Sequence, residues 1–172
     1  MCVFPFFGCA LICSCVCAGG CRVANLFVFN PKGEIIHCHL NAPGSWHNSS
    51  LSEELYDLLD HRVPDGYVLV ADTAFTGSPK LLKPLRQDQI ASLSASKHIS
   101  VRELCQEIKR HRVAVSVRQA AEWGMRALQG TWGRLQVPLP ANSQDRMLIL
   151  ELIARMHNFR TRRVGLNQIK TV

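Results

Sequence analysis

Two acidic residues stand where carboxylates could act together on a substrate. Asp72 directly follows the apolar run 67–71, which is typical of a buried strand, and open α/β sheets bind their ligands at the carboxyl ends of such strands. Glu122 lies in a later helical stretch, residues 118–124. Two-metal phosphodiester chemistry needs carboxylates that converge on divalent ions, and Mg²⁺ or Mn²⁺ would suit such oxygen ligands. The pair therefore indicates metal-dependent phosphodiester cleavage as one candidate chemistry.

Simpler interpretations of both acids stay open. Asp72 could start a turn by accepting a hydrogen bond from the backbone beside Thr73. Glu122 has Arg118 four residues before it and Arg126 four residues after it, which is the spacing of ordinary helix ion pairs. Spacing alone does not choose between these interpretations and a shared metal site.

Other catalytic classes are poorly supported. His37, Cys38 and His39 form a triplet whose two histidines would share one face of a strand, but no third zinc ligand is evident, and a half-exposed strand explains them as well. The Gly-x-Ser-x-Gly turn of a serine hydrolase does not occur. A Walker loop, a Gly-x-Gly-x-x-Gly fingerprint and a His-Glu-x-x-His motif are also missing.

The first 21 residues form an unusual head. They hold six of the eight cysteines and are apolar, and the first charged side chain is Arg22. A disulfide-stapled secreted domain would spread its cysteines over the whole fold, so the body does not belong to that class. Three interpretations of the head remain: a poorly specified segment, a membrane anchor, or a soft-metal site using Cys13, Cys15 and Cys17.

Charge is distributed just as unevenly. The 172 residues carry a net charge of +7, with −4 in residues 1–75 and +11 in residues 76–172. A C-terminal half this basic points to a polyanionic partner, with nucleic acid first and an anionic membrane surface second. A well-solvated basic surface is the plainer explanation.

The remaining patterns predict helices packed on a sheet, an α/β or α+β fold. Two strand-like runs, 23–30 and 34–40, surround a Pro-Lys-Gly turn and predict a hairpin. A loop follows over 41–50, and Ser49, Ser50 or Ser52 could cap the next helix. Further along we expect a helix over 52–61, a strand over 67–71, an irregular stretch over 76–100, a helical pattern over 101–112 that continues through 117–128, and an amphipathic helix over 143–160.

Five ordered motifs carry a family resemblance: Asn-Ala-Pro-Gly-Ser-Trp-His-Asn-Ser from residue 41, Ala-Asp-Thr-Ala-Phe from 71, Arg-Gln-Ala-Ala-Glu-Trp-Gly from 118, Leu-Gln-Gly-Thr-Trp-Gly-Arg-Leu from 128 and His-Asn-Phe-Arg-Thr-Arg from 157. Together they resemble the DDE superfamily endonuclease domain of Harbinger-type (PIF/Harbinger) transposases and their domesticated relatives. The resemblance runs from about residue 23 to the C-terminus. It implies a ribonuclease H-like sheet flanked by helices, and three acids that hold two divalent metals, Mg²⁺ or Mn²⁺, for cleavage of DNA.

The resemblance assigns roles to several residues. Asp72 matches the second acid of the family and Glu122 the third, while His47 and Asn48 lie in a supporting loop where the family usually has an Asp at the Asn48 position. It also implies nuclear DNA as the substrate and a separate Myb-like protein as the partner that recognises sequence. The basic C-terminal half would supply DNA contacts, with Arg155, Arg160, Arg162, Arg163 and Lys170 as candidates.

One departure from the family pattern argues against full enzyme activity. The first acid of the family lies on the first strand, usually as Asp-Gly, but residues 1–22 contain no acid and the first carboxylate is Glu34. We therefore expect a partial domain over 23–172, truncated at its N-terminus, with the first strand missing or replaced and a sheet edge left open. Loss of one metal carboxylate would impair catalysis. The alternative is a non-catalytic DNA- or protein-binding module.

Overall fold

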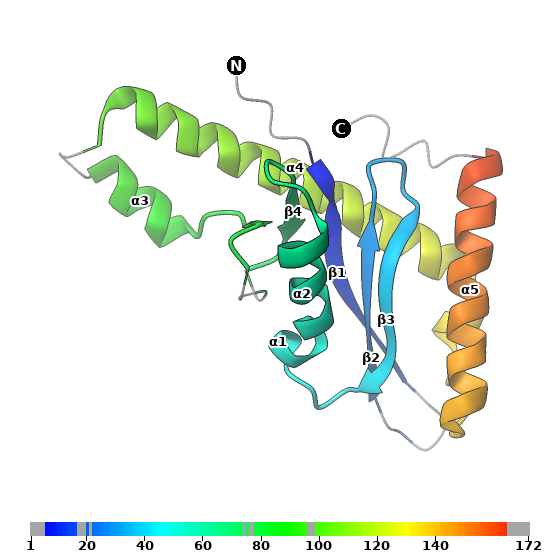
Figure 1. Ribbon diagram of the computed structural model, residues 1–172. Coiled ribbons are helices and arrows are strands. Elements are labelled where there is room, and N and C mark those ends of the chain that lie inside the picture. The colour runs from blue at the N-terminus through cyan, green and yellow to red at the C-terminus, as the bar shows by residue number, and fades with distance from the viewer. Residues whose placement is uncertain are drawn as a thin grey trace.

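The computed structural model describes residues 6–16, 20, 22–73, 75, 78–95 and 99–164, and it forms a sheet covered by helices (Figure 1). In chain order the elements are β1 (Phe6–Val16), β2 (Arg22–Phe29), β3 (Ile35–Pro43), α1 (Asn48–Leu51), α2 (Glu53–Arg62), β4 (Val68–Ala71), β5 (Leu81–Leu82), α3 (Gln87–Ala95), α4 (Val101–Thr131), the 3₁₀ turn η1 (Gly133–Gln136) and α5 (Ser143–Val164). The expectation of helices packed on a sheet is confirmed.

The five strands form one sheet in the order β3-β2-β1-β4-β5. Strand β2 runs antiparallel to both β1 and β3, whereas β4 runs parallel to β1 and β5 parallel to β4. The central strand, β1, comes from the cysteine-rich head. It pairs with β2 from Cys9 opposite Phe29 to Val16 opposite Arg22, and with β4 up to Ala10 opposite Ala71.

The alternative of a missing strand with an open edge is wrong, whereas the alternative of a replaced strand agrees with this placement. Residues of the head fill the position between β2 and β4, so the sheet is continuous there. The segment is uncharged, and an uncharged strand suits the centre of a sheet that helices cover on both faces. Cys13 and Cys15 lie in β1, but Cys17 lies outside the described residues. Within the described part of the chain, none of the helices has the length and apolar character needed to cross a membrane.

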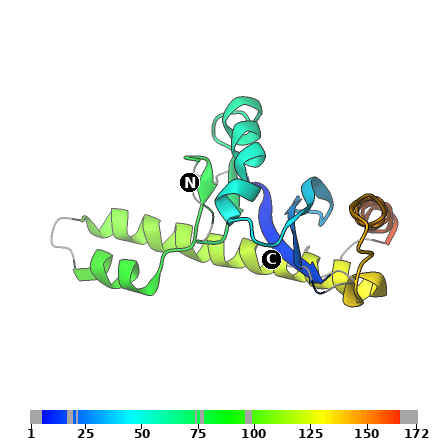
Figure 2. The same cartoon turned by 90° about the horizontal axis from the view of Figure 1, so that it is seen from below.

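Helices cover both faces of the sheet, as the view from below shows (Figure 2). On one face, the even-numbered residues Ala24, Leu26 and Val28 of β2 pack with Leu51, Leu55 and Leu59 of α1 and α2. On the other, Val23, Phe27 and Phe29 pack with Ala114, Ala121, Met125 and Leu128 of α4 and Leu150, Ile153 and Ala154 of α5. Because side chains alternate along a strand, β2 is buried on both faces.

The predicted hairpin of β2 and β3 is confirmed, and β3 continues to Pro43, beyond the predicted end at residue 40. The extension passes an irregularity in the register between Ala24 and Leu26. There the Asn25 side chain accepts a hydrogen bond from the Asn41 backbone at 2.8 Å, and Asn41 has a positive φ of 63°. A side-chain contact thus replaces a ladder bond, which strand periodicity does not reveal.

The helix predicted over 52–61 is confirmed as α2, but a short α1 precedes it. Ser52 occupies the predicted N-cap position of α2, although its side chain makes no capping hydrogen bond. Neither helix has a side-chain cap hydrogen bond. Ser52 instead donates its hydroxyl hydrogen to the carbonyl of Asn48 at 2.7 Å, because its backbone continues the turn from α1 into α2.

The stretch 76–100 is more ordered than expected, since it contains β5 and α3. The helical patterns after it form one 31-residue helix, α4, which begins at a capping box: Ser100 accepts from the Glu103 backbone, and the Glu103 side chain accepts from Ser100. The first half of α4 extends beyond the sheet alongside α3 (Figures 1 and 2).

The last helix, α5, is present and longer than predicted, but only part of its apolar set is buried. Leu150 and Ile153 lie in the core, whereas Leu148, Leu152 and Phe159 are each more than half exposed. The buried side of α5 also holds polar residues, Arg146, His157 and Thr161. Arg146 contacts Asn41 of β3 and His157 contacts Gly33 of the β2–β3 turn, so these two residues join this side of α5 to the hairpin.

Candidate functional site

Asp72 follows the buried strand β4, as the sequence predicts. Leu69 and Ala71 belong to the core on the α2 side and Val70 to the core on the α4 side, so alternation directs Asp72 towards α4. Its carboxylate oxygen Oδ1 accepts a hydrogen bond from the backbone N–H of Thr73 at 2.7 Å. The turn interpretation of Asp72 is therefore correct, and the side chain still lies 44% exposed beside α4.

Glu122 lies on α4, on the turn that follows Arg118. Two small buried residues of α4, Ala114 and Ala121, face the sheet and allow the helix to approach it closely. The guanidinium Nη2 of Arg118 lies 3.2 Å from the Glu122 carboxylate, so the predicted helix ion pair with Arg118 is present.

The same guanidinium also reaches Asp72. Its Nη1 lies 3.8 Å from Oδ1 of Asp72, so Arg118 lies between the two carboxylates that the sequence singled out. All three side chains are between 36% and 44% exposed, which leaves the cluster open to solvent and to a ligand. The structure thus brings Asp72 and Glu122 together around one cation.

Among the residues that the structure describes, no third carboxylate joins this cluster. Because Ala10 pairs with Ala71, the next register position of β1 beside Asp72 is Leu11, and the sequence has no acid anywhere in β1. Within the described residues, no group of three His, Cys, Asp or Glu side chains could hold a metal ion. DDE superfamily endonucleases generally use divalent metals, but two carboxylates around a guanidinium do not make a donor set for two such ions.

The supporting loop lies on the other side of the sheet. His47 is the exposed residue that precedes α1, and the carbonyl of Asn48 accepts the Ser52 hydroxyl. Leu51 of the same short helix packs with α2, on the face opposite α4. Neither His47 nor Asn48 has a hydrogen bond or ion pair with Asp72 or Glu122 among the described contacts. The structure therefore does not bring this loop into the acidic cluster.

The histidine triplet lies on β3. His37 is half-buried and its Nε2 has no hydrogen-bond partner among the described residues, and burial lowers the pKa of its imidazole. His39 instead lies 3.3 Å from Glu54 of α2. The three residues of the triplet are partly exposed on β3, and no third ligand for zinc lies beside them within the described residues.

Each predicted DNA-binding arginine of α5 has a partner within the protein. Arg155 pairs with Glu151 of the same helix, with Nε 3.2 Å from the carboxylate, and Arg160 donates to the Thr131 hydroxyl of α4 at 3.1 Å. Arg162 donates to Glu34 at 2.7 Å and lowers the pKa of that carboxyl, and Arg163 lies 5.2 Å from the centre of the Phe159 ring. These contacts leave DNA binding by the four residues a prediction; Lys170 lies outside the described residues.

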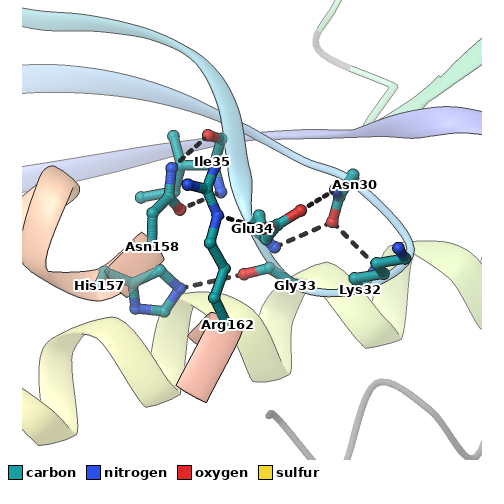
Figure 3. Close-up of polar contacts among 8 residues, drawn as sticks. All are labelled: Asn30, Lys32, Gly33, Glu34, Ile35, His157, Asn158 and Arg162. Atoms are coloured by element: carbon teal, nitrogen blue, oxygen red, sulfur yellow. Dashed lines mark hydrogen bonds and ion pairs between the residues drawn. The ribbon is translucent and has the colours of Figure 1, made fainter. Parts of the chain in front are cut away.

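Two residues of the last motif have a structural role that spacing did not reveal (Figure 3). The Asn158 side chain accepts from the backbone N–H of Ile35 and donates to its carbonyl, both at 2.7 Å. The Nε2 of His157, which is fully buried, lies 3.1 Å from the carbonyl of Gly33. Together they attach α5 to the start of β3, much as a neighbouring strand would. The sequence indicates this contact between α5 and β3 only through the His-Asn pair itself.

Comparison with protein families identifies the family of this chain. A family described as DDE superfamily endonuclease matches residues 22–158, which include Asp72, Arg118, Glu122 and the His157–Asn158 pair. No match was found among curated proteins or among solved structures. Because the match covers most of the chain and contains both members of the acidic pair, this protein belongs to the DDE superfamily endonuclease family.

Proposed function

We propose that this chain is a transposase-derived DDE nuclease domain of the Harbinger type that binds DNA and has lost most of its cleavage activity. One observation carries the proposal: Asp72 and Glu122 meet at the carboxyl end of β4, and Arg118 lies between them where further carboxylates and cations would be needed. The sheet order, with an antiparallel β1–β2–β3 meander and parallel β4 and β5, supports a ribonuclease H-like fold.

The electrostatics of the cluster explain the loss of activity. Two ions about 4 Å apart need several carboxylates to offset their charge, whereas this cluster supplies two and neutralises half of that charge with a guanidinium. A divalent ion entering here would also be repelled by Arg118. The residues present can orient a phosphodiester through the guanidinium, which donates hydrogen bonds in a planar fork, but they do not supply a base for a water nucleophile at a metal.

The basic C-terminal half supports DNA as the partner. The net charge of +11 in residues 76–172 would attract the phosphate backbone without regard to sequence. Sequence recognition then falls to a separate protein, and a Myb-like partner and a nuclear location belong to the same proposal.

The test uses the full chain, because a fragment starting at residue 22 would lack β1, the central strand. Binding to a labelled duplex is measured by fluorescence anisotropy, and cleavage is measured as nicking of supercoiled plasmid with Mg²⁺ or Mn²⁺. We expect salt-dependent binding with no nicking above the level of the Asp72→Asn variant. Failure to bind DNA at low salt would contradict the proposed partner, and nicking that requires Asp72 would contradict the proposed impairment.

A further inference from the structure

An open pocket of about 480 Å³ lies at the end of the sheet where β2 begins and β3 ends, beside the start of α5. In Figure 1 these three ends meet at the bottom of the molecule. No acidic residue is among the residues that line it, which are Arg22, Val23, Asn41, Pro43, Gly44, Ser45, Ser143 and Arg146. Two arginines and two serines thus line one pocket.

Arg146 is a buried cation of the pocket whose hydrogen-bond partners within the described chain are all neutral. Only 9% of it is exposed, and its partners are neutral: the Asn41 side-chain oxygen at Nε and the carbonyls of Pro140 and Ala141, both 3.0 Å from Nη1. Among the described residues no carboxylate lies within ion-pair distance of Arg146. A buried cation without a counter-charge is costly, and a bound anion would offset that cost.

The pocket is held in shape by contacts independent of any ligand. Asn41, in the left-handed region at φ 63°, donates its amide to the carbonyl and the hydroxyl of Ser143, each at 3.0 Å. The Gly44 N–H donates to the carbonyl of Arg22 at 2.9 Å. A Cβ at Gly44 would lie 2.6 Å from that same carbonyl oxygen, so only glycine permits this approach. The backbone of Arg22 and the side chains of Ser143 and Arg146 are therefore positioned before a ligand arrives.

We propose that this pocket binds a phosphate group of the DNA backbone, an inference that rests on the proposed function. Arginine guanidinium groups recognise phosphate oxygens through paired hydrogen bonds, and hydroxyl groups complete such sites. The pocket uses Arg22 and Arg146. Neither is among the four arginines near the end of α5 that the sequence predicts to bind DNA. It would fix the position of the duplex on the sheet without reading its sequence.

The test compares the salt dependence of duplex binding by wild type, Arg22→Gln and Arg102→Gln. Arg22 is exposed at the pocket, whereas Arg102 is an exposed arginine at the far end of α4, so both variants lose the same charge. If one phosphate contact is lost, the slope of log Kd against log salt falls by about 0.9 in Arg22→Gln and stays unchanged in Arg102→Gln. If the slope changes equally in the two variants, the loss of net charge alone explains the effect, and the proposal is overturned.

A second measurement separates the pocket from DNA binding as a whole. Inorganic phosphate is titrated into wild type and Arg22→Gln while the melting temperature is followed, and we expect a rise for wild type that is smaller in the variant. An Arg146→Lys variant keeps the buried charge but loses the planar fork, and it should show the same reduced response. If wild type binds no duplex but responds to phosphate through Arg22, the proposed function fails and DNA is the wrong source of the phosphate. An equal rise in melting temperature with phosphate in all three proteins would overturn the proposal that the pocket binds phosphate.

Discussion

Replacing Asn158 by alanine tests how α5 holds the β2–β3 hairpin. The side chain makes two hydrogen bonds of 2.7 Å to the backbone N–H and carbonyl of Ile35, a residue that is only 8% exposed. A made hydrogen bond contributes about 1 kcal/mol, and leaving a buried group unpaired costs about 1–3 kcal/mol. Water can reach part of this contact, so we expect the free energy of unfolding to fall by about 2–4 kcal/mol.

The assay is urea unfolding of the full chain, followed by far-UV circular dichroism. Arg155→Ala is the matched control on the same helix: its ion pair with Glu151 is exposed on the arginine side, so its loss should cost less than about 1 kcal/mol. Amide hydrogen exchange adds a local readout, because the Ile35 amide should lose protection in Asn158→Ala. A loss below about 1 kcal/mol, together with unchanged protection at Ile35, would refute the role assigned to Asn158.

Two further predictions concern charge. Burial lowers the pKa of His157 below its usual 6.5; the hydrogen bond to the Gly33 carbonyl raises this pKa and the nearby Arg160 lowers it further. The neutral ring therefore contributes stability that is present above about pH 6.5 and is lost as the pH falls through the lowered pKa. Unfolding free energy measured from pH 8 to pH 5 should fall by at most about 1.4 kcal/mol per pH unit through this one group, and His157→Gln should flatten that fall; an identical pH profile in both proteins would contradict it. At the acidic cluster, Arg118→Gln removes the cation between Asp72 and Glu122, so Mn²⁺ affinity measured by electron paramagnetic resonance should rise about fivefold relative to wild type. Arg126→Gln, the control one turn beyond Glu122, should leave that affinity unchanged, and equal affinities in all three proteins would show that Arg118 does not oppose a metal.

Local patterns predicted most of the elements around the site. The apolar run before Asp72 is buried as β4, because a continuous apolar stretch ending in an acid suits a covered strand. The hairpin and the long helix that carries Glu122 also follow from spacing and turn residues. These features depend on neighbours within a few residues, which is the range that periodicity reports.

The features that local patterns missed depend on distant partners. The head lacks the alternation of a half-exposed strand, and it becomes β1 only because β2 and β4 pair with it on either side. The contact of Arg118 with Asp72 joins residues 46 apart and depends on how α4 crosses the sheet. The pocket at Arg146 joins α5 to Asn41, 105 residues away, through a left-handed residue that no periodicity indicates.

Cleavage of supercoiled plasmid by the full chain is the sharpest test of whether Asp72 and Glu122 still support catalysis. With Mg²⁺ or Mn²⁺ present and DNA binding established in the same preparation, we expect the plasmid to stay supercoiled, because Asp72 and Glu122 face Arg118 rather than a third carboxylate. Metal-dependent conversion to the nicked form, abolished by Asp72→Asn, would contradict it.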